Sequence, residues 1–377
     1  MRTGIFGGAF DPFHQEHKNV IIAAKEELEL DKIIVLPSYL PPHKSNIVTP
    51  YEDREAMVIA GCRDLPYVIV DDLERRRGGV NPTSEILPIL KQANPDDEMY
   101  LIIGGDSARD FHSWINPKKI ADIAKIAIVS RSGADDIDAY AAQIREDYGA
   151  DVTVLQYKGG EISSSALRAS LFAGVVPEGL PEGVSSVIEE RKLYRQYTDL
   201  VERLRHDLSK KRFMHSVGTA VYAVGFCSRL HLPYEDVFVA AILHDCGKER
   251  AEEVLGIPSG VVHQFVGEER ARRYYGIKNE DVLDAIKYHT TGKANMTTLG
   301  KLIFCADVLE PGRDYPGVDE LRELFEKDFE KGFLEIVKHT YRRLVQDKMD
   351  IYYLTVECLE YYNTSEECRK RGAFAGK

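Results

Sequence analysis

The chain has 377 residues, more than one ordinary hydrophobic core organises, so two domains are expected. Its content of 44% hydrophobic and 29% charged residues is that of a soluble globular protein. The formal net charge of −12 argues against nucleic acid as a partner, because a large polyanion needs a basic surface, whereas small phosphorylated ligands need only a few local cations.

Membrane and export signals are missing from the sequence. No apolar run approaches ~18 residues and no signal peptide precedes Gly4, so neither a membrane span nor secretion is expected. The 6 cysteines show no paired spacing and lie mostly in apolar segments. They are expected to be reduced core thiols of a cytoplasmic protein.

The opening segment, residues 4–17, is an apolar strand that runs into Gly7 and Gly8 and then through an Asp-Pro turn into a helix. The glycines lack Cβ atoms, so the backbone can bend tightly and present its N–H groups to a phosphate. The positive N-terminal end of the helix points at the same place. His14 and His17 share one helix face, where both can donate to phosphate oxygens. The segment predicts a phosphate-binding loop, although many α/β domains begin with a similar strand, glycine and helix.

Alternating strands and helices follow the opening. A helix is expected at Val20–Leu28. Further strands are expected at residues 32–37, 67–70, 99–103, 126–129 and 152–155. This alternation predicts an α/β domain with a Rossmann-like, mostly parallel sheet, helices on both faces and ligands at the carboxyl ends of the strands.

Several loops after these strands carry polar residues. Pro41-Pro42-His43-Lys44 presents a cation on a stiff turn, and Gly104-Gly105-Asp106 repeats the strand-then-glycine pattern. The segment 162–168 offers serine hydroxyls and N–H groups at a helix start, which suits an anion, although the serines are also ordinary N-caps. Thr83 lies in another polar loop. The single tryptophan, Trp114, is of a type more often found in a core than as a ligand platform.

Taken together, residues 1–195 resemble the bacterial nicotinate-nucleotide adenylyltransferases, within the nucleotidyltransferase superfamily. The resemblance implies an ATP site and a mononucleotide site. The implied ATP site comprises Gly7, Gly8, Ala9, Phe10, His14, His17, Ile162, Ser163, Ser164 and Arg168. The implied mononucleotide site comprises Lys44, Thr83, Gly104, Asp106 and Trp114, with the pyridine ring stacked on the indole.

The resemblance also implies a reaction. The phosphate of the mononucleotide would attack the α-phosphorus of ATP in line and expel pyrophosphate, without a protein nucleophile. His14 and His17 would stabilise the triphosphate, while Lys44 and Arg168 would hold phosphate groups. Mg²⁺ would be held mainly by the substrate phosphates, as hard cations usually are.

The chain departs from the family pattern at a few positions. Glu16 stands where the family usually has glycine, and an acidic side chain there would repel a triphosphate unless it points away. Ile115 stands in place of a frequent tyrosine, and Arg131-Ser132-Gly133 in place of an Arg-Pro-Gly turn. Val80-Asn81-Pro82-Thr83 differs from the usual Ser-Tyr-Thr. Nucleotidyl transfer stays the expectation, and a phosphorylated acceptor other than nicotinate mononucleotide is the alternative.

The boundary between the halves has no Pro/Gly linker. The first domain is expected to span residues 1–196 and to close with a helix at Val184–Leu193. An all-α domain without a strand is expected at residues 197–364, followed by a polar, disordered tail at residues 365–377.

The second half places polar residues inside apolar helical segments, where they are costly unless paired or bound to metal. These residues are His215, His244, Asp245, His263, His289 and Asp307. Any one of these histidines alone is more often a satisfied core residue, but the full set predicts a metal centre. Six N/O ligands exceed a tetrahedral zinc site and favour dinuclear iron or manganese.

His244-Asp245, with a later aspartate in an apolar helix, is typical of the HD phosphohydrolases, and residues 200–362 are similar to the bacterial HD family that cleaves diadenosine tetraphosphate symmetrically to two ADP. The motifs that carry this resemblance are His215, His244-Asp245, His263, His289-Thr290-Thr291-Gly292 and residues 306–313, with Asp307-Val308-Leu309 in place of Asp-Lys-Ile. The resemblance implies a metal pair that clamps a phosphate and turns bound water into hydroxide. Lys248 and Arg313 would hold the remaining phosphates.

The sequence therefore predicts a fused bifunctional enzyme that joins ATP to nicotinate mononucleotide and hydrolyses diadenosine tetraphosphate or a related nucleotide. The second half could instead be a non-catalytic nucleotide sensor, or a hydrolase of an alarmone or a cyclic dinucleotide. A sensor need not keep all six candidate ligands, which argues against that alternative. The native metal stays open, and a homo-oligomer is compatible with the sequence.

Overall fold

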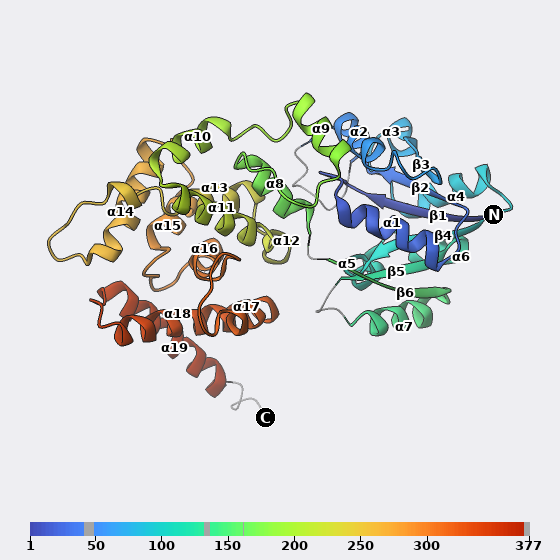
Figure 1. The fold of residues 1–377 in the computed structure, drawn as a ribbon. Helices are drawn as coiled ribbons and strands as arrows, with labels where there is room; N and C mark the ends of the chain where they lie inside the picture. The colour runs from blue at the N-terminus through green and yellow to red at the C-terminus, as the bar shows by residue number, and fades with distance from the viewer. Residues whose placement is uncertain (41–48, 132–135, 161, 373–377) are drawn as a thin grey trace. The chain divides into compact units, whose positions relative to one another are not determined.

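The computed structural model describes residues 1–40, 49–131, 136–160 and 162–372 (Figure 1). The chain forms two compact units. Unit 1 contains Met1–Arg168 and Pro177–Tyr194, and unit 2 contains Ala169–Val176 and the chain from Arg195 onward. The division differs from the single boundary near residue 196 that the sequence suggests, because the chain passes between the units at three points.

Unit 1 is built on a six-stranded sheet with the order β3-β2-β1-β4-β5-β6, in which all pairs are parallel. The strands are β1 (Arg2–Gly8), β2 (Lys32–Pro37), β3 (Val68–Val70), β4 (Glu98–Gly104), β5 (Lys125–Arg131) and β6 (Val152–Gly159). The chain runs outward from β1 to β3 and then returns to the other side of β1. The strand order therefore reverses between β1 and β4, and ligands of such sheets bind at the carboxyl ends of the strands at this point.

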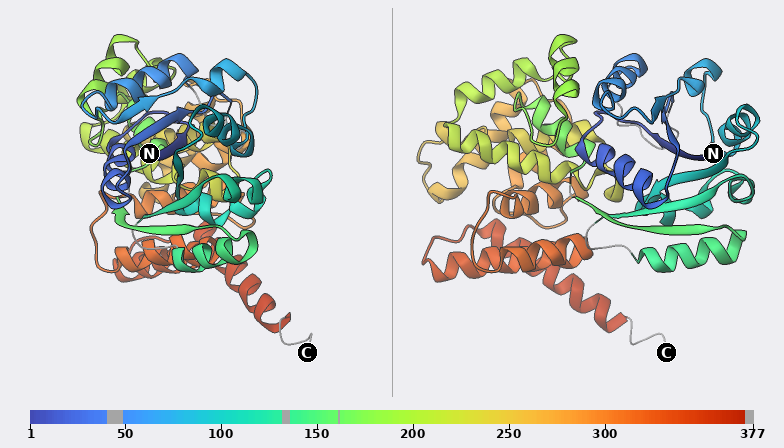
Figure 2. Two further views of the ribbon diagram at one scale, coloured as in Figure 1. Left: turned by 90° about the vertical axis from the view of Figure 1, so that its right-hand side faces the viewer. Right: turned by 45° about the vertical axis from the view of Figure 1, so that its right-hand side comes forward.

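The helices of unit 1 cover both faces of the sheet, as the two views in Figure 2 show. They are α1 (Gln15–Glu27), α2 (Tyr51–Gly61), α3 (Leu73–Arg77), α4 (Thr83–Ala93), α5 (Gly105–Arg109), the 3₁₀ helix η1 (Phe111–Ser113), α6 (Pro117–Ile123), α7 (Ile137–Tyr148), α8 (Ser164–Phe172), whose end belongs to unit 2, and α9 (Glu182–Glu190). Alternate strand residues such as Ile5, Leu101 and Ile126 pack against α4, α6 and α7. The predicted α/β fold with a parallel sheet is confirmed.

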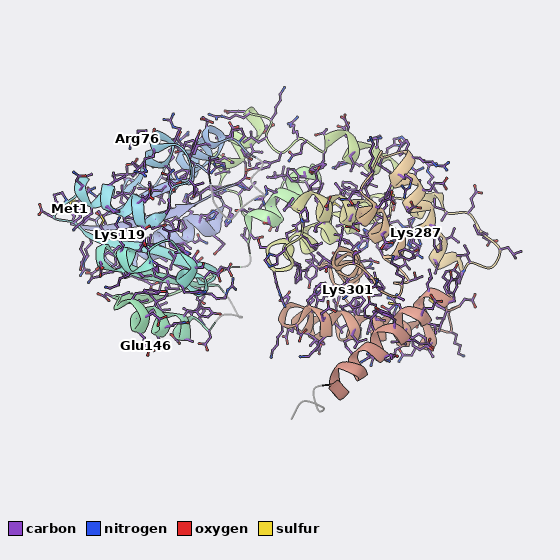
Figure 3. The ribbon with its side chains drawn as sticks, turned by 180° about the vertical axis from the view of Figure 1, so that it is seen from behind. Met1, Arg76, Lys119, Glu146, Lys287 and Lys301 are labelled. Carbon is purple, nitrogen blue, oxygen red and sulfur yellow. The ribbon has the colours of Figure 1, made fainter. Side chains whose placement is uncertain are left out.

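Many charged side chains lie on the outer surface of unit 1. Arg76, Lys119 and Glu146 are exposed and project away from the sheet (Figure 3). The carboxyl ends of β1 and β4 have a different character, because glycines and short polar side chains lie there. The binding edge predicted from the alternation of strands and helices thus differs in composition from the charged outer surface.

Unit 2 is helical, as predicted. Its helices are α10 (Thr198–Asp207), α11 (Lys210–Val224), α12 (Cys227–Leu230), α13 (Tyr234–Leu243), η2 (Lys248–Arg250), α14 (Ser259–Arg273), α15 (Glu280–Tyr288), α16 (Thr298–Leu309), α17 (Val318–Lys327), α18 (Phe329–Gln346) and α19 (Tyr353–Gly372). Extended pairing in the described part of this unit is limited to one bridge between Val254 and Ile257. Helix α13 is buried along its length and contacts α11, α15 and α16, so these four helices surround one core.

The C-terminal end differs from the sequence prediction. The segment 365–377 was expected to be disordered, but α19 continues through residues 365–372. The physical reason is that this stretch is rich in Glu, Lys and Arg, which are good helix formers, and contains no glycine or proline before Gly372.

Two further predictions concern the state of the cysteines and the lack of a membrane span. Cys62, Cys227, Cys246, Cys305 and Cys358 are buried and free, as predicted for reduced thiols, and Cys368 lies outside the side chains that the structure describes. Among the described residues, none of the helices combines the length and the apolar character needed to cross a bilayer.

Candidate functional sites

Gly7 and Gly8 are the last two residues of β1, at the point where the strand order reverses, and we call Gly7–Phe10 the glycine loop. Gly7 is exposed, and a Cβ added there would come no closer than 4.0 Å to the carbonyl oxygen of Leu36. A Cβ on Gly8 would lie 2.9 Å from the ring of Phe10, which has a φ of 54°. The backbone of the loop is thus accessible at Gly7 and tightly packed at Gly8, as a phosphate-binding turn requires.

The structure brings the two predicted histidines together. His14 is the N-cap residue of α1, and its backbone N–H donates to Nδ1 of His17 at 3.2 Å. The two rings stack with centroids 3.7 Å apart. Because Nδ1 of His17 accepts a hydrogen bond, the proton of its neutral ring lies on Nε2. His17 can therefore donate from Nε2, whereas His14 is buried.

Glu16 points away from the glycine loop. Its Oε2 accepts hydrogen bonds from the hydroxyl of Tyr157 at 2.8 Å and from the N–H of Gly160 at 2.7 Å. Its Oε1 accepts from Asn19 at 3.0 Å. The departure from the family pattern is thus accommodated by β6 and the loop after it.

The segment 162–168 docks on the Asp-Pro turn. Ser163 Oγ accepts from the N–H of Ala166 and so acts as an N-cap, while Ser164 Oγ donates to the carbonyl of Pro12 at 3.2 Å. Arg168 is buried and donates from Nη1 to the carbonyl of Asp11 at 2.5 Å. Ile162, Ser163, Ser164 and Arg168 therefore lie beside the loop, with Arg168 supporting its turn.

The predicted mononucleotide residues come from several elements. Gly104 ends β4, which lies next to β1, and is exposed, as is Asp106, whose carboxylate lies 3.4 Å from Arg109. Thr83 begins α4, and the partly buried Trp114 packs on the sheet core and against Phe111, with ring centroids 5.3 Å apart. Lys44 lies outside the described residues.

Sequence reasoning missed one residue of this site. Arg54 on α2 is buried and donates to three carbonyl oxygens, those of Thr49 at 3.1 Å, Ala9 at 2.7 Å and Tyr39 at 3.3 Å. It thereby anchors the glycine loop and two neighbouring loops. The available signal was its spacing, which puts Arg54 on the buried face of α2 with Met57 and Val58.

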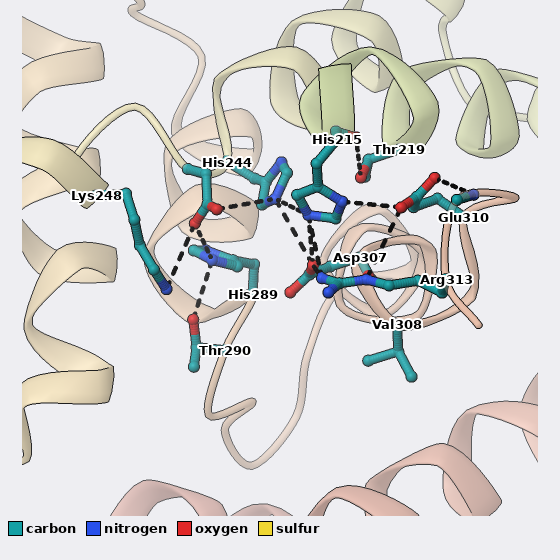
Figure 4. A network of polar contacts seen from close by, with 12 residues as sticks. His215, Thr219, His244, Lys248, His289, Thr290, Asp307, Val308, Glu310 and Arg313 are labelled. Atoms are coloured by element: carbon teal, nitrogen blue, oxygen red, sulfur yellow. Dashed lines mark hydrogen bonds and ion pairs between the residues drawn. The ribbon is translucent and has the colours of Figure 1, made fainter. Parts of the chain in front are cut away.

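The six predicted metal ligands lie close together in unit 2, with Nε2 of His263 3.4 Å from Oδ1 of Asp245. Figure 4 shows His215, His244, His289 and Asp307 among them. They come from α11, the ends of α13 and α15, α14 and α16. Nε2 of His244 lies 3.3 Å from Nε2 of His215, and Nε2 of His263 lies 3.2 Å from Nε2 of His289. Two overlapping groups have ligand spacing, His215 with His244 and Asp307, and His244 with Asp245 and His289. The two groups share His244, and one imidazole nitrogen binds one ion. Two ions would therefore divide the donors into one set of His215, His244 and Asp307 and another of Asp245, His263 and His289.

The hydrogen bonds of the imidazole rings indicate which ring nitrogen carries a proton and which can bind a cation. His244 Nδ1 lies 2.7 Å from the carbonyl oxygen of Ala241, and His289 Nδ1 lies 2.8 Å from that of Ile286. A carbonyl only accepts, so Nδ1 carries the proton and Nε2 carries the lone pair in both rings. Lone pairs facing other ring nitrogens at 3.2 to 3.3 Å repel unless a cation or a proton lies between them. The donor set therefore fits divalent cations.

Protonation differs among the ligands: burial opposes the charged ring of His215, but the carboxylates of Asp307 and Glu310 raise its pKa to about 9. Burial opposes ionisation of Asp245, but the neighbouring His244 and His289 hold the pKa of its carboxyl well below the usual value. Burial lowers the pKa of His244 to about 4 and that of His263 to about 2. At neutral pH this carboxylate is charged and these two rings are neutral, which are the forms that bind metal ions.

Two cations border the centre. Lys248 Nζ lies 3.1 Å from His263 Nε2, and Arg313 Nη2 lies 2.5 Å from Asp307 Oδ1. Both side chains are partly exposed, at 32% and 39%. Sequence reasoning included Glu310 in the motif at residues 306–313 but gave it no role, and its Oε1 lies 3.1 Å from His215 Nδ1. Its signal was a carboxylate three residues after Asp307 at the end of an apolar helix.

Comparison with known proteins matches each unit to a family. The cytidylyltransferase-like family matches residues 5–170, and the HD domain matches residues 212–312. The chain is 34% identical over 213 residues to "Probable nicotinate-nucleotide adenylyltransferase" of Syntrophotalea carbinolica, covering 52% of this chain and 98% of that protein. It is 36% identical over 179 residues to "Bis(5'-nucleosyl)-tetraphosphatase, symmetrical" of Staphylococcus aureus, covering 43% of this chain and 92% of that protein.

A third relative spans both units. "Probable nicotinate-nucleotide adenylyltransferase/Ap4A hydrolase" of Mycoplasma genitalium is 24% identical over 364 residues, covering 91% of this chain and 98% of that protein. The first half of the chain thus belongs to the nicotinate-nucleotide adenylyltransferase family, and the second half belongs to the HD-family symmetrical bis(5'-nucleosyl)-tetraphosphatases.

Proposed function

We propose that the chain is a bifunctional enzyme of nucleotide metabolism, in which unit 1 forms nicotinate adenine dinucleotide and unit 2 hydrolyses diadenosine tetraphosphate to two ADP. The observation that carries the proposal is that each unit contains a separate group of candidate functional residues. Unit 1 has two glycines followed by two histidines, and unit 2 has five N/O side chains at ligand spacing with His263 beside them. The relative that spans both units carries both activities in its name.

In unit 1 the proposed reaction is transfer of AMP. A phosphate oxygen of nicotinate mononucleotide bonds to the α-phosphorus of ATP as the bond to the β-phosphate breaks, and pyrophosphate leaves. The N–H groups from Gly7 to Phe10 and Nε2–H of His17 bind the triphosphate, while Arg168 holds the turn that presents them. Mg²⁺ enters with the phosphates of ATP. Catalysis then depends on positioning and on donors placed where charge develops.

The proposed mononucleotide site lies beside this loop. Gly104 leaves room at the end of β4, where a Cβ would meet nothing within 4 Å. Asp106, Thr83 and Lys44 supply polar contacts, and Trp114 supplies a face for the pyridine ring. Because Trp114 also packs on the core, its indole is held in one orientation, which suits stacking.

In unit 2 we infer a dinuclear iron or manganese centre, supported by two overlapping ligand groups of imidazole and carboxylate. Bound divalent ions supply a Lewis acid that polarises a phosphate and activates water. The oxygen of water bonds to phosphorus while the central P–O–P bridge breaks, which yields two ADP. Lys248 and Arg313 neutralise the phosphate charge, and their partly exposed head groups can reach a substrate.

We also place the protein in the cytoplasm. Support comes from the five described free cysteines, which are buried and unbridged, as in a reducing compartment. Both proposed reactions consume nucleotides.

The test combines metal analysis with a substrate panel on the full chain and on His244→Ala. His244 belongs to both ligand groups, so the variant is expected to lose bound metal and to hydrolyse diadenosine tetraphosphate at least about 100-fold more slowly. Formation of nicotinate adenine dinucleotide should be retained. The panel compares nicotinate with nicotinamide mononucleotide, and diadenosine tetraphosphate with cyclic dinucleotides and alarmones.

His206→Ala is the matched control, because His206 is an exposed histidine of unit 2 outside the ligand groups. It should leave both activities and the metal content unchanged. Loss of both activities in folded His244→Ala, or full metal content in that variant, would contradict the proposal.

A further inference from the structure

Glu310 follows α16 and is buried, at 5% exposure. Its Oε1 lies 3.1 Å from His215 Nδ1, and its Oε2 accepts a hydrogen bond from the N–H of Gly312 at 2.7 Å (Figure 4). Both carboxylate oxygens are therefore engaged, and the carboxylate has a single fixed position against the ring of His215. A carboxylate accepts from an imidazole N–H, so Nε2 of His215 is left to face the centre.

Two glycines provide the space for this carboxylate. A Cβ added at Gly218, three residues after His215 on α11, would overlap Oε2 of Glu310. A Cβ at Gly312 would lie 3.0 Å from both oxygens. Glycine inside a helix costs roughly 0.5–1 kcal/mol relative to alanine. Glycine at position 218 thus lowers the stability of α11. It also leaves the space in which the carboxylate of Glu310 contacts Nδ1 of His215.

His215 differs in this respect from the other rings. His244 and His289 are oriented by carbonyl oxygens of their own helices, three residues earlier. His215 is oriented by a charged group from another segment, 95 residues away in sequence. A carboxylate partner raises the basicity of an imidazole ligand and holds its ring plane. Only one of the two ligand groups, His215 with His244 and Asp307, includes this ring.

We propose that Glu310 is a positioning residue that acts through His215 and sets the affinity of the ion held by His215, His244 and Asp307, leaving the affinity of an ion held by Asp245 and His289 unchanged. The inference rests on the dinuclear centre proposed above. The two ion sites would then differ in how their imidazole ligands are held. His215 is held by the carboxylate of Glu310, whereas His289 is held by the backbone carbonyl of Ile286.

The test is a Mn²⁺ titration of the full chain by equilibrium dialysis, with electron paramagnetic resonance to distinguish one bound ion from a coupled pair. The wild type should bind two ions. In Glu310→Gln, one dissociation constant should rise about 10–100-fold while the other stays the same. The coupled-pair signal should then appear only at higher Mn²⁺. Glu310→Asp should recover part of the affinity.

Glu330→Gln is the matched control. Glu330 is half-exposed on α18 and pairs with Lys301 at 2.8 Å. The Glu330→Gln variant should therefore bind two ions with wild-type dissociation constants. Two unchanged constants in Glu310→Gln, or equal weakening of both, would overturn the inference while the centre itself stands. A wild type that binds no Mn²⁺ would instead overturn the proposed centre.

A second variant covers the case in which circular dichroism shows Glu310→Gln to be unfolded. Gly218→Ala keeps the glutamate but places a methyl group where its carboxylate lies. It should weaken the same single site. Wild-type constants for both ions in folded Gly218→Ala would count equally against the role of Glu310.

Discussion

At the scale of single residues, both sites depend on which atoms of a side chain are already bonded. Nδ1 of His17 accepts from the backbone, whereas Nδ1 of His244 lies against a carbonyl oxygen, so Nε2 is a donor in the first ring and a lone-pair ligand in the second. The same residue type can therefore donate to a phosphate in unit 1, as proposed for His17, and bind a metal ion in unit 2, as proposed for His244.

Glu74 allows a test of the buried polar network under the glycine loop. Burial raises the pKa of Glu74 to about 7 from 4.5, while the N–H of Tyr39 and the charge of Arg54 partly oppose this. Between these two pH values the folded chain retains a proton that the unfolded chain releases. The stability contributed by protonated Glu74 is thus fully present below pH 4.5 and is lost as the pH rises through about 7.

Glu74→Gln removes this dependence. Relative to the wild type, the variant should gain up to roughly 3 kcal/mol in the unfolding free energy of unit 1 between pH 4.5 and 8. Urea unfolding at the two pH values measures the difference. Glu85→Gln is the control: Glu85 is half-exposed and pairs with Arg77, so its effect should stay below about 1 kcal/mol at either pH. A Glu74→Gln difference that does not change with pH would contradict the prediction.

At the scale of elements, the HD loop is held by direct packing of backbone on backbone. A Cβ at Gly247 would overlap the carbonyl oxygen of His263 and lie 2.5 Å from the nitrogen of Gly267. The turn after Asp245 therefore rests on α14 with no room for a side chain. This contact sets the distance between Asp245 and His263.

Gly247→Ala is expected to push the turn away from α14. Overpacking of this kind should lower the stability of unit 2 by about 1–3 kcal/mol. Hydrolysis of diadenosine tetraphosphate should fall more than adenylyl transfer, because only the hydrolytic site shifts. Thermal unfolding and the two activity assays measure this.

Gly260→Ala, in the first turn of α14, is the matched substitution. A Cβ there meets nothing within 4 Å, so the change should stabilise the helix by up to about 1 kcal/mol and leave hydrolysis unaltered. Equal effects of the two alanines would show that packing at Gly247 does not position the site.

At the scale of the whole molecule, the chain combines two units with separate cores and separate sites. The proposed metal centre brings together ligands from five segments of folded unit 2, so removal of the metal should destabilise that unit alone. At an ion concentration 100 times the dissociation constant, binding contributes about 2.7 kcal/mol.

Chelation by EDTA should therefore lower the unfolding temperature of unit 2 by roughly 5–10 °C and leave that of unit 1 in place. Calorimetry of the full chain, with Mn²⁺ added back as the control, measures both transitions. A single transition that shifts as a whole, or no shift at all, would contradict separate stabilisation of the units.

Local sequence determined a large part of this description. The strand at residues 32–37 matches β2, because a buried strand of a parallel sheet is a continuous apolar run. The ligands His244 and Asp307 stand out because polar residues inside apolar helices need partners. Such signals lie within a few residues of chain, so they can be read without a fold.

Only the tertiary structure decided how distant segments meet. Glu16 turns toward β6 because its partners, Tyr157 and Gly160, lie 141 and 144 residues away. Arg168 supports a turn 157 residues away, and Glu310 reaches His215 across 95. These contacts depend on strand order and helix packing, which place groups side by side with no trace in the local pattern. Residue types thus determined which chemistry is available, and packing decided which atom of each residue is free to perform it.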